Sequence, residues 1–393
     1  MAVTFIVNPG SSSKKYALYA GTKLLLAAHI ERAEKGTILC TMADGSQDRC
    51  QMIGDNTYET SLLDFLERAL NEKAITSTTD ITVVGVRVVA PGTAFSTHRI
   101  IDDTFMRDLA VAANRAPLHV PHTEHELKVL RQALPHATFV AASDSAFHAA
   151  MPAWAKSYSL PASDAALYDI YRFGYHGLSV AGALRKLAKL PEVSTRRIIV
   201  CHLGSGVSVT AVRDGQSIDT TMGYAPGSGL IMGSRAGDID AGALLALMEE
   251  RRFKVADAQT YLQTKGGLKG IAGESDLRFL LEARAKGEKK ATLAIDSFIY
   301  AIQKAIGAYV AALGGLDTLV FTATAGERSP VLRSLITAPL SGLGVRLDED
   351  KNNALISRDG VISADNKEGV VRVVVLKSEE ASEILAVATK LTA

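Results

Sequence analysis

The chain contains few cysteines and almost no net charge. Its 393 residues include Cys40, Cys50 and Cys201, and this odd number in a long chain argues against a disulfide scaffold and favours a reducing compartment. Lys and Arg number 43 against 42 Asp and Glu, a formal net charge of +1. A protein that binds the phosphate backbone of nucleic acids normally carries a basic excess. We therefore expect a cytoplasmic protein with no nucleic-acid partner.

Long apolar runs and leader signals are also absent from the sequence. The longest runs, such as Val370–Leu376, are too short and too interrupted to cross a bilayer, so they predict buried strands and no membrane partner. The N-terminal residues lack a basic segment followed by a long apolar core. Hydrophobic residues make up 47% and charged residues 22%, which excludes disordered, collagen-like and coiled-coil chains. The length predicts about two globular domains.

A strand–turn–strand pattern occurs twice, half a chain apart. In each copy two apolar, β-branched segments flank a glycine-rich turn. The two copies comprise Thr4–Val7, Asn8–Ser13 and Lys15–Tyr19, and then Arg197–Val200, His202–Gly206 and Val207–Val212. Phe5 and Ile198 lie 193 residues apart (198 − 5), close to half the length of the chain. This spacing favours an internal duplication over two unrelated hairpins.

Helical periodicity separates these strands. Apolar residues recur at helical spacing in Ser61–Ala74, Thr123–Leu134 and Leu293–Leu313. The spacing of a capping box occurs twice, in Ser61 with Asp64 and in Thr123 with Glu126. Strands that alternate with helices predict an α/β fold. No linker-like segment marks the domain boundary, which we place around 147–163.

Three glycine-containing segments are candidate phosphate sites. Backbone N–H groups and hydroxyls in Asn8–Lys15 are suited to phosphate oxygens, and its two lysines add positive charge, although the segment alone also fits a solvated hairpin turn. It is not a Walker A loop, because no G-x-x-x-x-G-K-[ST] occurs. His202–Gly206 has the same character, so two turns could hold one polyphosphate. Val320–Arg328 fits either a nucleotide-binding turn or an ordinary βα connection.

Other polar residues occur where core residues would be expected. The stretch 220–240 contains five glycines, one arginine and two aspartates, which favours a functional loop over a plain surface loop. Arg87 interrupts the apolar strand Val83–Val89, so it either pairs with a structural carboxylate or points into a site. Asp144 follows the apolar run Thr138–Ala142, where it is a site residue or a helix cap.

The histidines do not form a recognisable metal motif. His119, His122 and His125 lack the H-E-x-x-H pattern and a nearby cysteine, so a loop and a helix face are favoured over a zinc site. His176, between glycines and aromatics, would by itself be taken as a packed histidine. No G-x-S-x-G occurs, which argues against a hydrolase with a nucleophile elbow.

Taken together, a dozen motifs in order along the whole chain resemble the acetate kinase family of short-chain carboxylate kinases. That family belongs to the superfamily of actin, the heat-shock chaperone ATPases and sugar kinases. The motifs are VNPGSSSKKYAL, RVV at Arg87, NRAPLH at Asn114–His119, SDSAFHAAMP at Ser143–Pro152, RFGYHG at Arg172–Gly177, HLGSG, DTTMGYAP, GSRAGDID, SDLR at Ser275–Arg278, VFTATAGERSP, LGVRLD and KSEEASEILA.

The resemblance implies a fold, an activity and an assembly. The fold would be two duplicated ribonuclease-H-like α/β domains around a central cleft, residues 1–150 with about 381–393 and residues 151–380. The activity would be reversible transfer of the γ-phosphoryl group of ATP to acetate with Mg²⁺ (or Mn²⁺), giving acetyl phosphate and ADP. The assembly would be a homodimer.

The resemblance also implies residue roles. Arg87 and Arg235 would bind the carboxylate and the transferred group, His176 would stabilise the transition state, and Asp144 would orient the acceptor. Asn8 and Glu379 would hold the metal. The methyl pocket would be lined by Val89, Leu118, Tyr175 and Pro226. The phosphates and the nucleotide would contact Ser11, Ser13, Lys15, His202, Leu203, Gly204, Ser205, Gly206, Asp276, Leu277, Arg278, Thr324, Ala325, Gly326, Glu327 and Arg328.

Several positions depart from the family pattern, mostly on the nucleotide side. The family's H-L-G-N-G has Ser205 in place of asparagine, and its G-I-G-E-N turn is replaced by Thr324–Arg328. The remaining departures are Ala90, Tyr175, Val180 and Ser228. Pyrophosphate therefore stays open as the phosphoryl donor and propionate as the acceptor. The rival from another class is a nucleotide-binding protein without kinase turnover.

Overall fold

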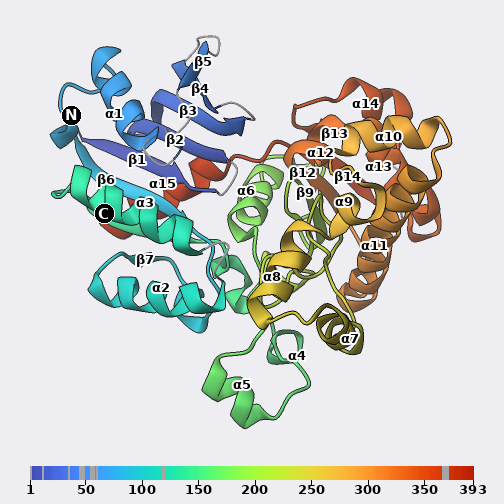
Figure 1. Ribbon diagram of the computed structural model, residues 1–393. Coiled ribbons are helices and arrows are strands. Elements are labelled where there is room, and N and C mark those ends of the chain that lie inside the picture. The colour runs from blue at the N-terminus through green and yellow to red at the C-terminus, as the bar shows by residue number, and fades with distance from the viewer. Residues whose placement is uncertain are drawn as a thin grey trace. The chain divides into compact units, whose positions relative to one another are not determined.

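The computed structural model describes residues 2–10, 13–33, 36–43, 49–53, 58, 61–116, 120–364 and 371–393. The chain divides into two compact units (Figure 1). Unit 1 consists of Met1–Ala146 and Glu379–Ala393, and unit 2 consists of Phe147–Ser378. The domain ranges expected from the sequence stay a prediction of where the functional domains divide.

Unit 1 is built on an eight-stranded mixed sheet. Its strands in chain order are β1 (Val3–Asn8), β2 (Ser13–Ala20), β3 (Lys23–Ala33), β4 (Gly36–Ala43), β5 (Arg49–Ile53), β6 (Ile81–Val88), β7 (Arg99–Ile100) and β8 (Thr138–Ser143). The order across the sheet is β5-β4-β3-β2-β1-β6-β8-β7. Strands β1 to β5 are joined antiparallel, whereas β1, β6 and β8 run parallel to one another.

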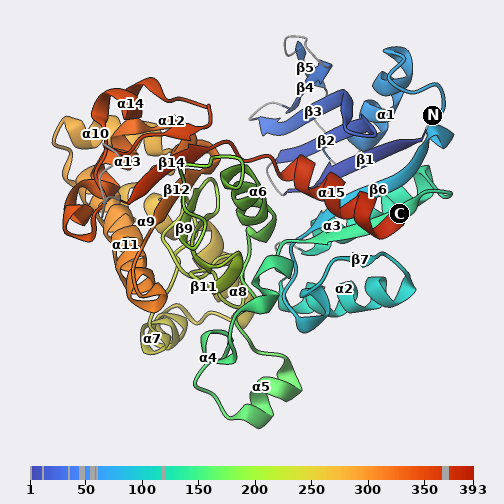
Figure 2. The ribbon, with the colours of Figure 1, turned by 180° about the vertical axis from the view of Figure 1, so that it is seen from behind.

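Helices cover both faces of this sheet. They are α1 (Ser61–Asn71), α2 (Asp103–Arg115), α3 (Val120–Ala133) and α15 (Glu380–Thr392). Successive residues of β1 point to opposite faces. Phe5 stacks on Phe65 of α1, whereas Ile6 lies beside Gly85 near Ile384 of α15. Figures 1 and 2 accordingly show α1 and α3 on one side of the sheet and α15 on the other. The central strands are therefore apolar on both faces.

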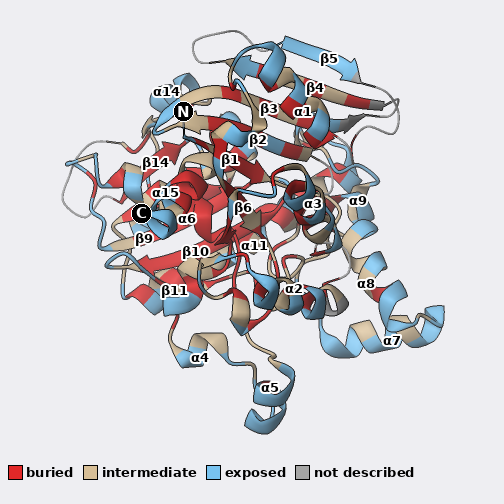
Figure 3. Ribbon diagram, turned by 90° about the vertical axis from the view of Figure 1, so that its left-hand side faces the viewer, coloured by how far each residue is buried: buried red, intermediate tan, exposed pale blue. Residues whose placement is uncertain are grey.

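Unit 2 contains a six-stranded sheet surrounded by helices. Its strands are β9 (Arg197–Leu203), β10 (Val207–Arg213), β11 (Gln216–Thr220), β12 (Thr318–Thr322), β13 (Gly360–Val361) and β14 (Arg372–Leu376), in the order β11-β10-β9-β12-β14-β13. Its helices are α4 (Ala153–Lys156), α5 (Ala162–Tyr168), α6 (Gly177–Leu187), α7 (Ala241–Arg251), α8 (Val255–Thr264), α9 (Gly267–Ala272), α10 (Leu277–Ala285), α11 (Lys289–Leu313), α12 (Ala323–Arg328), α13 (Pro330–Thr337) and α14 (Glu349–Ala354). Figure 3 shows α5 and much of α7 exposed, while the strands are largely buried.

The topology confirms the predicted duplication. In unit 1, β3-β2-β1 is antiparallel and β1-β6-β8 is parallel. In unit 2, β11-β10-β9 is antiparallel and β9-β12-β14 is parallel. A short antiparallel strand follows in each sheet, β7 beside β8 and β13 beside β14. The α/β class and the duplicated arrangement expected from the sequence are thus present in this chain.

Both predicted capping boxes are wrong. Ser61 is the first residue of α1, and its hydroxyl donates to the carbonyl oxygen of Tyr58. Asp64 Oδ2 is buried without a hydrogen-bond partner among the described residues. Thr123 lies inside α3, which begins three residues earlier, and Glu126 contacts strand β2 instead of a helix end. His122 and His125 lie on the face of α3, as expected, and His119 lies outside the described residues.

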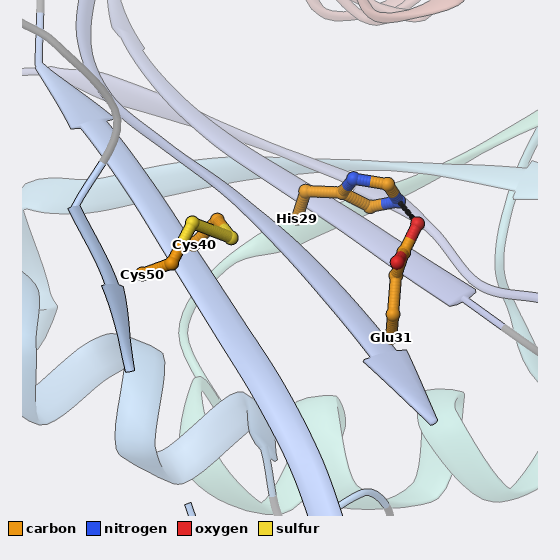
Figure 4. Close-up of a disulfide and its surroundings, with 4 residues drawn as sticks. All are labelled: His29, Glu31, Cys40 and Cys50. Carbon is orange, nitrogen blue, oxygen red and sulfur yellow. Dashed lines mark ion pairs between the residues drawn. A yellow bond between two sulfur atoms is a disulfide. The ribbon is translucent and has the colours of Figure 1, made fainter. Parts of the chain in front are cut away.

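The structure contains a disulfide that the cysteine count did not predict. Cys40 and Cys50 face each other across the β4–β5 pair with their Cα atoms 4.0 Å apart, and His29 is the partner of Cys40 on β3 (Figure 4). Cys201 is buried, and burial raises the pKa of its thiol above the ordinary value. A single bridge across an edge hairpin still differs from a disulfide scaffold. Among the helices of the described residues, none combines the length and apolar character needed to span a membrane.

Candidate functional site

Four polar residues of unit 1 converge where its parallel strands end. Asn8 ends β1, Arg87 lies near the end of β6, and Asp144 follows β8. Because β1, β6 and β8 are parallel neighbours, their carboxyl ends share one edge of the sheet. Glu380 reaches this edge from the first turn of α15, which packs on the same strands. The fold therefore builds a polar cluster from four distant segments.

Arg87 is the centre of this cluster. Its Nε and Nη2 donate to Oδ1 and Oδ2 of Asp144 at 3.2 and 2.9 Å, a bidentate pair. Its Nη1 donates at 3.3 Å to both Asn8 Oδ1 and Glu380 Oε2. Asn8 Nδ2 in turn donates to Glu380 Oε2 at 2.7 Å. The Asp144 side chain is completely buried, so this carboxylate depends on the arginine for its charge balance.

The electrostatics of the cluster follow from this pairing. Burial disfavours the charged guanidinium of Arg87, but the carboxylates of Asp144 and Glu380 outweigh burial and hold its pKa above the ordinary value. Of the two alternatives given by the sequence for Arg87, pairing with a carboxylate is confirmed by Asp144, and a role in a site stays a prediction. The sequence analysis assigned Glu379 to the site and did not name Glu380; Glu379 immediately precedes α15, and Glu380 is the residue that bonds Arg87 and Asn8. Burial, followed by the Glu379 charge, raises the pKa of nearby Tyr19.

The two lysines of the first phosphate turn point to opposite faces of β2. Lys14 is buried, and its Nζ lies 2.8 Å from Glu126 Oε2. Lys15 is exposed, opposite Asn8 in the β1–β2 pair. Because a strand alternates its side chains, the expectation that both lysines supply charge to a ligand is wrong for Lys14, and for Lys15 it stays a prediction. Ser13 begins β2, and Ser11 lies outside the described residues.

Two stacked histidines lie next to the second predicted phosphate turn, in unit 2. His176 precedes α6 with a left-handed φ of 62°, and His202 lies in β9. Their ring centroids are 3.9 Å apart with an interplanar angle of 20°. Nδ1 of His176 is 2.9 Å from Ser208 Oγ, and Nδ1 of His202 is 2.8 Å from Ser179 Oγ. Each ring is therefore fixed through the same nitrogen.

The Nε2 atoms of these rings face the glycine-rich turn. A Cβ added to Gly206 would lie 2.8 Å from His176 Nε2, and one added to Gly204 would lie 3.3 Å from His202 Nε2. Glycine at these positions lets the backbone approach the imidazoles. The predicted turn His202–Gly206 is only partly a turn, since His202 and Leu203 belong to β9. Ser205 is exposed at its tip.

The glycine-rich loop 220–240 is ordered by its own hydrogen bonds. Arg235 Nη1 donates to the carbonyl oxygen of Pro226 at 3.0 Å, and Gly229 N–H donates to Asp238 Oδ1 at 2.7 Å. The Tyr175 hydroxyl donates to the carbonyl oxygen of Tyr224 at 2.7 Å. Tyr175 is fully buried, so its hydroxyl serves the loop. Of the residues expected in the acyl pocket, Pro226 is part of the loop that carries Arg235, and Tyr175 is hydrogen-bonded to the same loop.

The expected nucleotide turn is the beginning of a helix. Strand β12 ends at Thr322, and α12 follows at once, so Thr324 to Arg328 are helical and the segment forms the βα connection that the sequence left open as one alternative. Thr324 and Arg328 are exposed, Ala325 is half-buried, and Gly326 and Glu327 are buried.

Arg333 on α13 donates hydrogen bonds to the carbonyl oxygens near the end of this helix. It is completely buried, and its Nη1 donates to the carbonyl oxygens of Gly326 and Glu327 at 2.8 and 3.2 Å. Its other donors contact Asn352 and Leu355. Burial lowers the pKa of Arg333 to about 10. The sequence analysis missed this residue, whose only signal was an arginine within the apolar pattern of Pro330–Thr337.

The remaining predicted site residues make no hydrogen bond to these clusters among the described residues. Asp276 caps α10 and pairs with Arg278 at 2.6 Å, and this hydrogen bond lowers the pKa of the Asp276 carboxyl. Leu277 is the first residue of the same helix. Val89 is half-buried after β6, and Leu118 lies outside the described residues. Within the described residues, no group of three or more His, Cys, Asp or Glu side chains is arranged to hold a metal.

The comparisons with known proteins agree with the motifs. The profile of the acetokinase family matches residues 3–386. The chain belongs to the acetokinase family. It is 36% identical to the acetate kinase of Clostridium botulinum (strain Alaska E43 / Type E3) over 385 residues, 95% of this chain and 96% of that protein. It is also 36% identical to the acetate kinase of Thermoanaerobacter pseudethanolicus over 95% of each chain.

Solved structures give the same assignment. The crystal structure of Porphyromonas gingivalis acetate kinase has a TM-score of 0.87 at 29% identity and full coverage of both chains. A propionate kinase from Francisella tularensis has a TM-score of 0.90 at 30% identity, again with full coverage. Members of the acetokinase family are phosphotransferases that act on a carboxyl group.

Proposed function

We propose that this acetokinase-family protein is an acetate kinase that transfers the γ-phosphoryl group of ATP to acetate, reversibly, giving acetyl phosphate and ADP. The observation that carries the proposal is its 36% identity, over 95% of the chain, to proteins named acetate kinase. Arg87, Asp144, His176 and Arg235, the residues assigned to acceptor binding and transfer, are all present. In this proposal unit 1 binds the acceptor and unit 2 stabilises the phosphoryl group.

Unit 1 binds the acceptor in this proposal. A guanidinium has five N–H donors, and Arg87 makes four hydrogen bonds to Asp144, Asn8 and Glu380, so one Nη2 hydrogen remains for an acetate oxygen. Acetate is already deprotonated at neutral pH, so it needs no general base. Asp144 therefore orients Arg87 rather than accepting a proton, and Val89 and Leu118 line the methyl pocket.

Unit 2 stabilises the phosphoryl group in this proposal. Phosphoryl transfer needs in-line alignment and compensation of negative charge more than covalent chemistry. His176, with Nδ1 engaged by Ser208, presents Nε2 to a phosphoryl oxygen, and Arg235, held by the carbonyl oxygen of Pro226, supplies a positive charge to the transferred group. The turn Gly204–Gly206 would meet the phosphates through backbone N–H groups other than that of Gly204, which donates to the carbonyl oxygen of Gly206 at 3.0 Å. The two ends of the α12 segment, Thr324 and Arg328, contact the nucleotide together with Asp276, Leu277 and Arg278.

The metal fits the residues of unit 1. Asn8 contributes an amide oxygen and Glu379 a carboxylate, which are ligands that Mg²⁺ prefers, while the adjacent Glu380 is engaged by Asn8 and Arg87. Magnesium often uses one or two protein carboxylates and completes its shell with substrate phosphates and water, so a full protein cage is not required. Bound there, the ion would neutralise charge on the transferred phosphates. Glu379→Gln and Glu380→Gln form a matched pair, and a higher Mg²⁺ requirement in only the first would identify Glu379 as the ligand.

The test is formation of acyl phosphate trapped with hydroxylamine. Purified protein is given Mg²⁺ and acetate, with ATP and pyrophosphate tested separately. Product with ATP supports the proposal, and product with pyrophosphate alone means that pyrophosphate, not ATP, is the phosphoryl donor. No product with either donor refutes the kinase activity. Arg235→Ala is the matched control, and we expect it to lose roughly 10²–10³-fold in rate, as for single electrostatic donors. An unchanged rate would favour a binding protein.

A second acceptor belongs in the same assay. The F. tularensis propionate kinase is as similar in fold as the acetate kinase structures, with a TM-score of 0.90. Propionate tested beside acetate decides between them by the ratio of kcat/KM values. Tyr175, which is tied to the loop that carries Pro226, is the residue whose substitution by Phe should change that ratio.

We also propose that the protein is a homodimer of the cytoplasm. Helix α7 buries none of its residues, and Leu245 on it is 66% exposed. Trp154 on α4 is 85% exposed and Leu167 on α5 is 73% exposed. A contiguous exposed apolar patch marks an association surface, and the proposal is that these side chains contribute to one in the dimer. Light scattering after size-exclusion chromatography tests the dimer, with Leu245→Glu expected to produce monomer, and cell fractionation tests the location.

A further inference from the structure

A buried ion pair inside unit 1 has no part in the chemistry proposed above. Lys14 on β2 and Glu126 on α3 are 3% and 1% exposed, and their side chains meet at 2.8 Å. The Tyr16 hydroxyl donates to the second oxygen of Glu126. Burial, followed by the Glu126 charge, raises the pKa of Tyr16 above its ordinary value, so this hydroxyl keeps the proton that it donates. The carboxylate is thus fully engaged by two residues of one strand.

Stability alone does not account for this pair. Moving two charges out of water is costly, and well-packed apolar residues often stabilise a core equally well or better. The surrounding core is suited to such residues, since Phe5, Tyr16 and Phe65 pack together there. A buried charge pair is better explained when its hydrogen bonds orient something else.

The group that Lys14 orients is Tyr58. Lys14 Nζ donates to the carbonyl oxygen of Tyr58 at 2.7 Å, and the same nitrogen lies 4.8 Å from the centre of its ring. The Ser61 hydroxyl donates to the same carbonyl at 2.8 Å. Tyr58 is buried, with its hydroxyl as the outer end of the side chain. Both the backbone and the ring of this residue are therefore held by the core.

The hydroxyl of Tyr58 holds Gly10. It donates to the carbonyl oxygen of Gly10 at 2.5 Å, just after Asn8 at the end of β1. The backbone is tight at this point, because a Cβ added to Gly10 would lie 2.5 Å from the carbonyl oxygen of Ser13. A fixed carbonyl determines the plane of its peptide unit, since the peptide bond is planar. The hydrogen bonds thus run from Glu126 through Lys14 and Tyr58 to the backbone beside Asn8.

We propose that Glu126, Lys14 and Tyr58 are positioning residues that hold Gly10, and with it the end of β1, in the conformation that binds the phosphoryl donor. None of the three touches the donor itself. The proposal rests on the proposed kinase function only for the identity of the donor. It separates the two lysines of the motif, with Lys15 available to the ligand and Lys14 supporting the backbone from inside.

Tyr58→Phe tests the last link, because it removes one hydroxyl and keeps the ring. Hydrogen–deuterium exchange of the peptide around residues 5–15 should become about threefold to tenfold faster, which corresponds to the loss of one ordinary hydrogen bond. The KM for ATP should rise by about the same factor, with the KM for acetate and the Tm nearly unchanged. Tyr300→Phe, at a 63% exposed position in unit 2, is the matched control and should change none of these quantities.

The ion pair is tested by replacing both charges at once. Either charge removed alone leaves its partner buried and can unfold the unit, so the informative variant is Lys14→Met with Glu126→Leu. We expect its Tm to fall only moderately, because the buried Tyr16 hydroxyl loses its acceptor. Exchange around Gly10 should become faster, and the KM for ATP should rise while the KM for acetate stays unchanged. Wild-type exchange and KM in this double variant would overturn the role of the pair. So would parallel increases in both KM values with a lowered Tm, or faster exchange with an unchanged KM for ATP.

Failure of the kinase function remains distinguishable. If the wild-type protein forms no acyl phosphate with either donor, the exchange measurements still decide whether the network holds Gly10. The dissociation constants of Mg·ATP and pyrophosphate, measured by calorimetry, then replace KM. The same threefold to tenfold weakening in Tyr58→Phe supports the proposal, and equal affinities overturn it.

Discussion

Removal of Arg87 should damage stability and activity by separable amounts. Asp144 has no exposed surface, and its two oxygens accept hydrogen bonds from the Arg87 fork at 3.2 and 2.9 Å. Arg87→Met keeps most of the volume and leaves a buried carboxylate without its cation. Breaking a buried pair from one side costs about 3–5 kcal/mol. Because 1 kcal/mol shifts the Tm of a unit of this size by about 2–4 °C, the Tm should fall by roughly 6–20 °C.

The double variant Arg87→Met with Asp144→Leu isolates the pair. It removes the buried charge together with its partner, so most of the stability lost in Arg87→Met should return. The losses in unfolding free energy of Arg87→Met and Asp144→Leu, added together, should exceed the loss of the double variant by several kcal/mol. Activity should not return, because the acceptor still lacks its guanidinium. We expect both variants to form acetyl phosphate at least 10²-fold more slowly than the wild type.

Urea unfolding and the hydroxylamine assay measure the two effects on the same samples. Arg87→Lys serves as the conservative control, since it keeps the charge but loses the bidentate fork. A double variant no more stable than Arg87→Met would show that Asp144 is not balanced by Arg87. A double variant with near wild-type turnover would show that the cluster is structural only.

Three further substitutions test separate contacts. Burial and, after it, the charge of Lys390 lower the pKa of His98, while Asp144 opposes them, so the unfolded state binds more protons than the folded state. The free energy of unfolding should therefore fall as the pH drops below about 6.5. In urea unfolding at a series of pH values, His98→Gln should lose less stability at acid pH than the wild type. Arg333→Met removes the side-chain donor from buried carbonyls at the ends of α12 and α14, of which that of Glu327 keeps the Ser357 N–H. It should cost at least ~3 kcal/mol and raise the KM for ATP more than that for acetate, and equal increases would argue against a role of α12 in nucleotide binding. Gly85→Ala places a Cβ 2.9 Å from Ile384 Cγ2 of α15, so calorimetry should show a loss of about 1–3 kcal/mol, and an unchanged Tm would mean that α15 can move away without cost.

The fold was largely predictable because its signal is repeated and local. Each half of the chain begins with two apolar strands around a glycine turn, and both copies form the antiparallel part of a sheet. The errors concern helix starts. Thr123 and Glu126 have the spacing of a capping box, yet Thr123 is buried inside α3 and Glu126 reaches Lys14 on β2. A capping box is a short-range pattern, and the burial of a distant lysine outweighed it.

The site was predictable where a polar residue contradicts its surroundings. Arg87 interrupts an apolar strand, and Asp144 ends another, so the sequence located both halves of the central pair. Arg333 shows the limit of this reasoning, because an arginine within a helix is ordinarily exposed and its five backbone and amide acceptors come from separate segments. The disulfide between Cys40 and Cys50 was missed for a related reason, since cysteine spacing does not reveal which residues face each other across a hairpin.

The glutamates at the start of α15 show what geometry adds to a motif. Successive residues of an α-helix point about 100° apart, so two adjacent carboxylates at a helix start cannot serve the same partner equally. In this structure Glu380 bonds Asn8 and Arg87, and Glu379 lies near Tyr19. If Glu379 is the metal ligand, then Glu380 restrains the Asn8 amide and adds negative charge beside Arg87. Glu379 would then bind the ion, while Glu380 positions Asn8, the other residue proposed to bind the same ion.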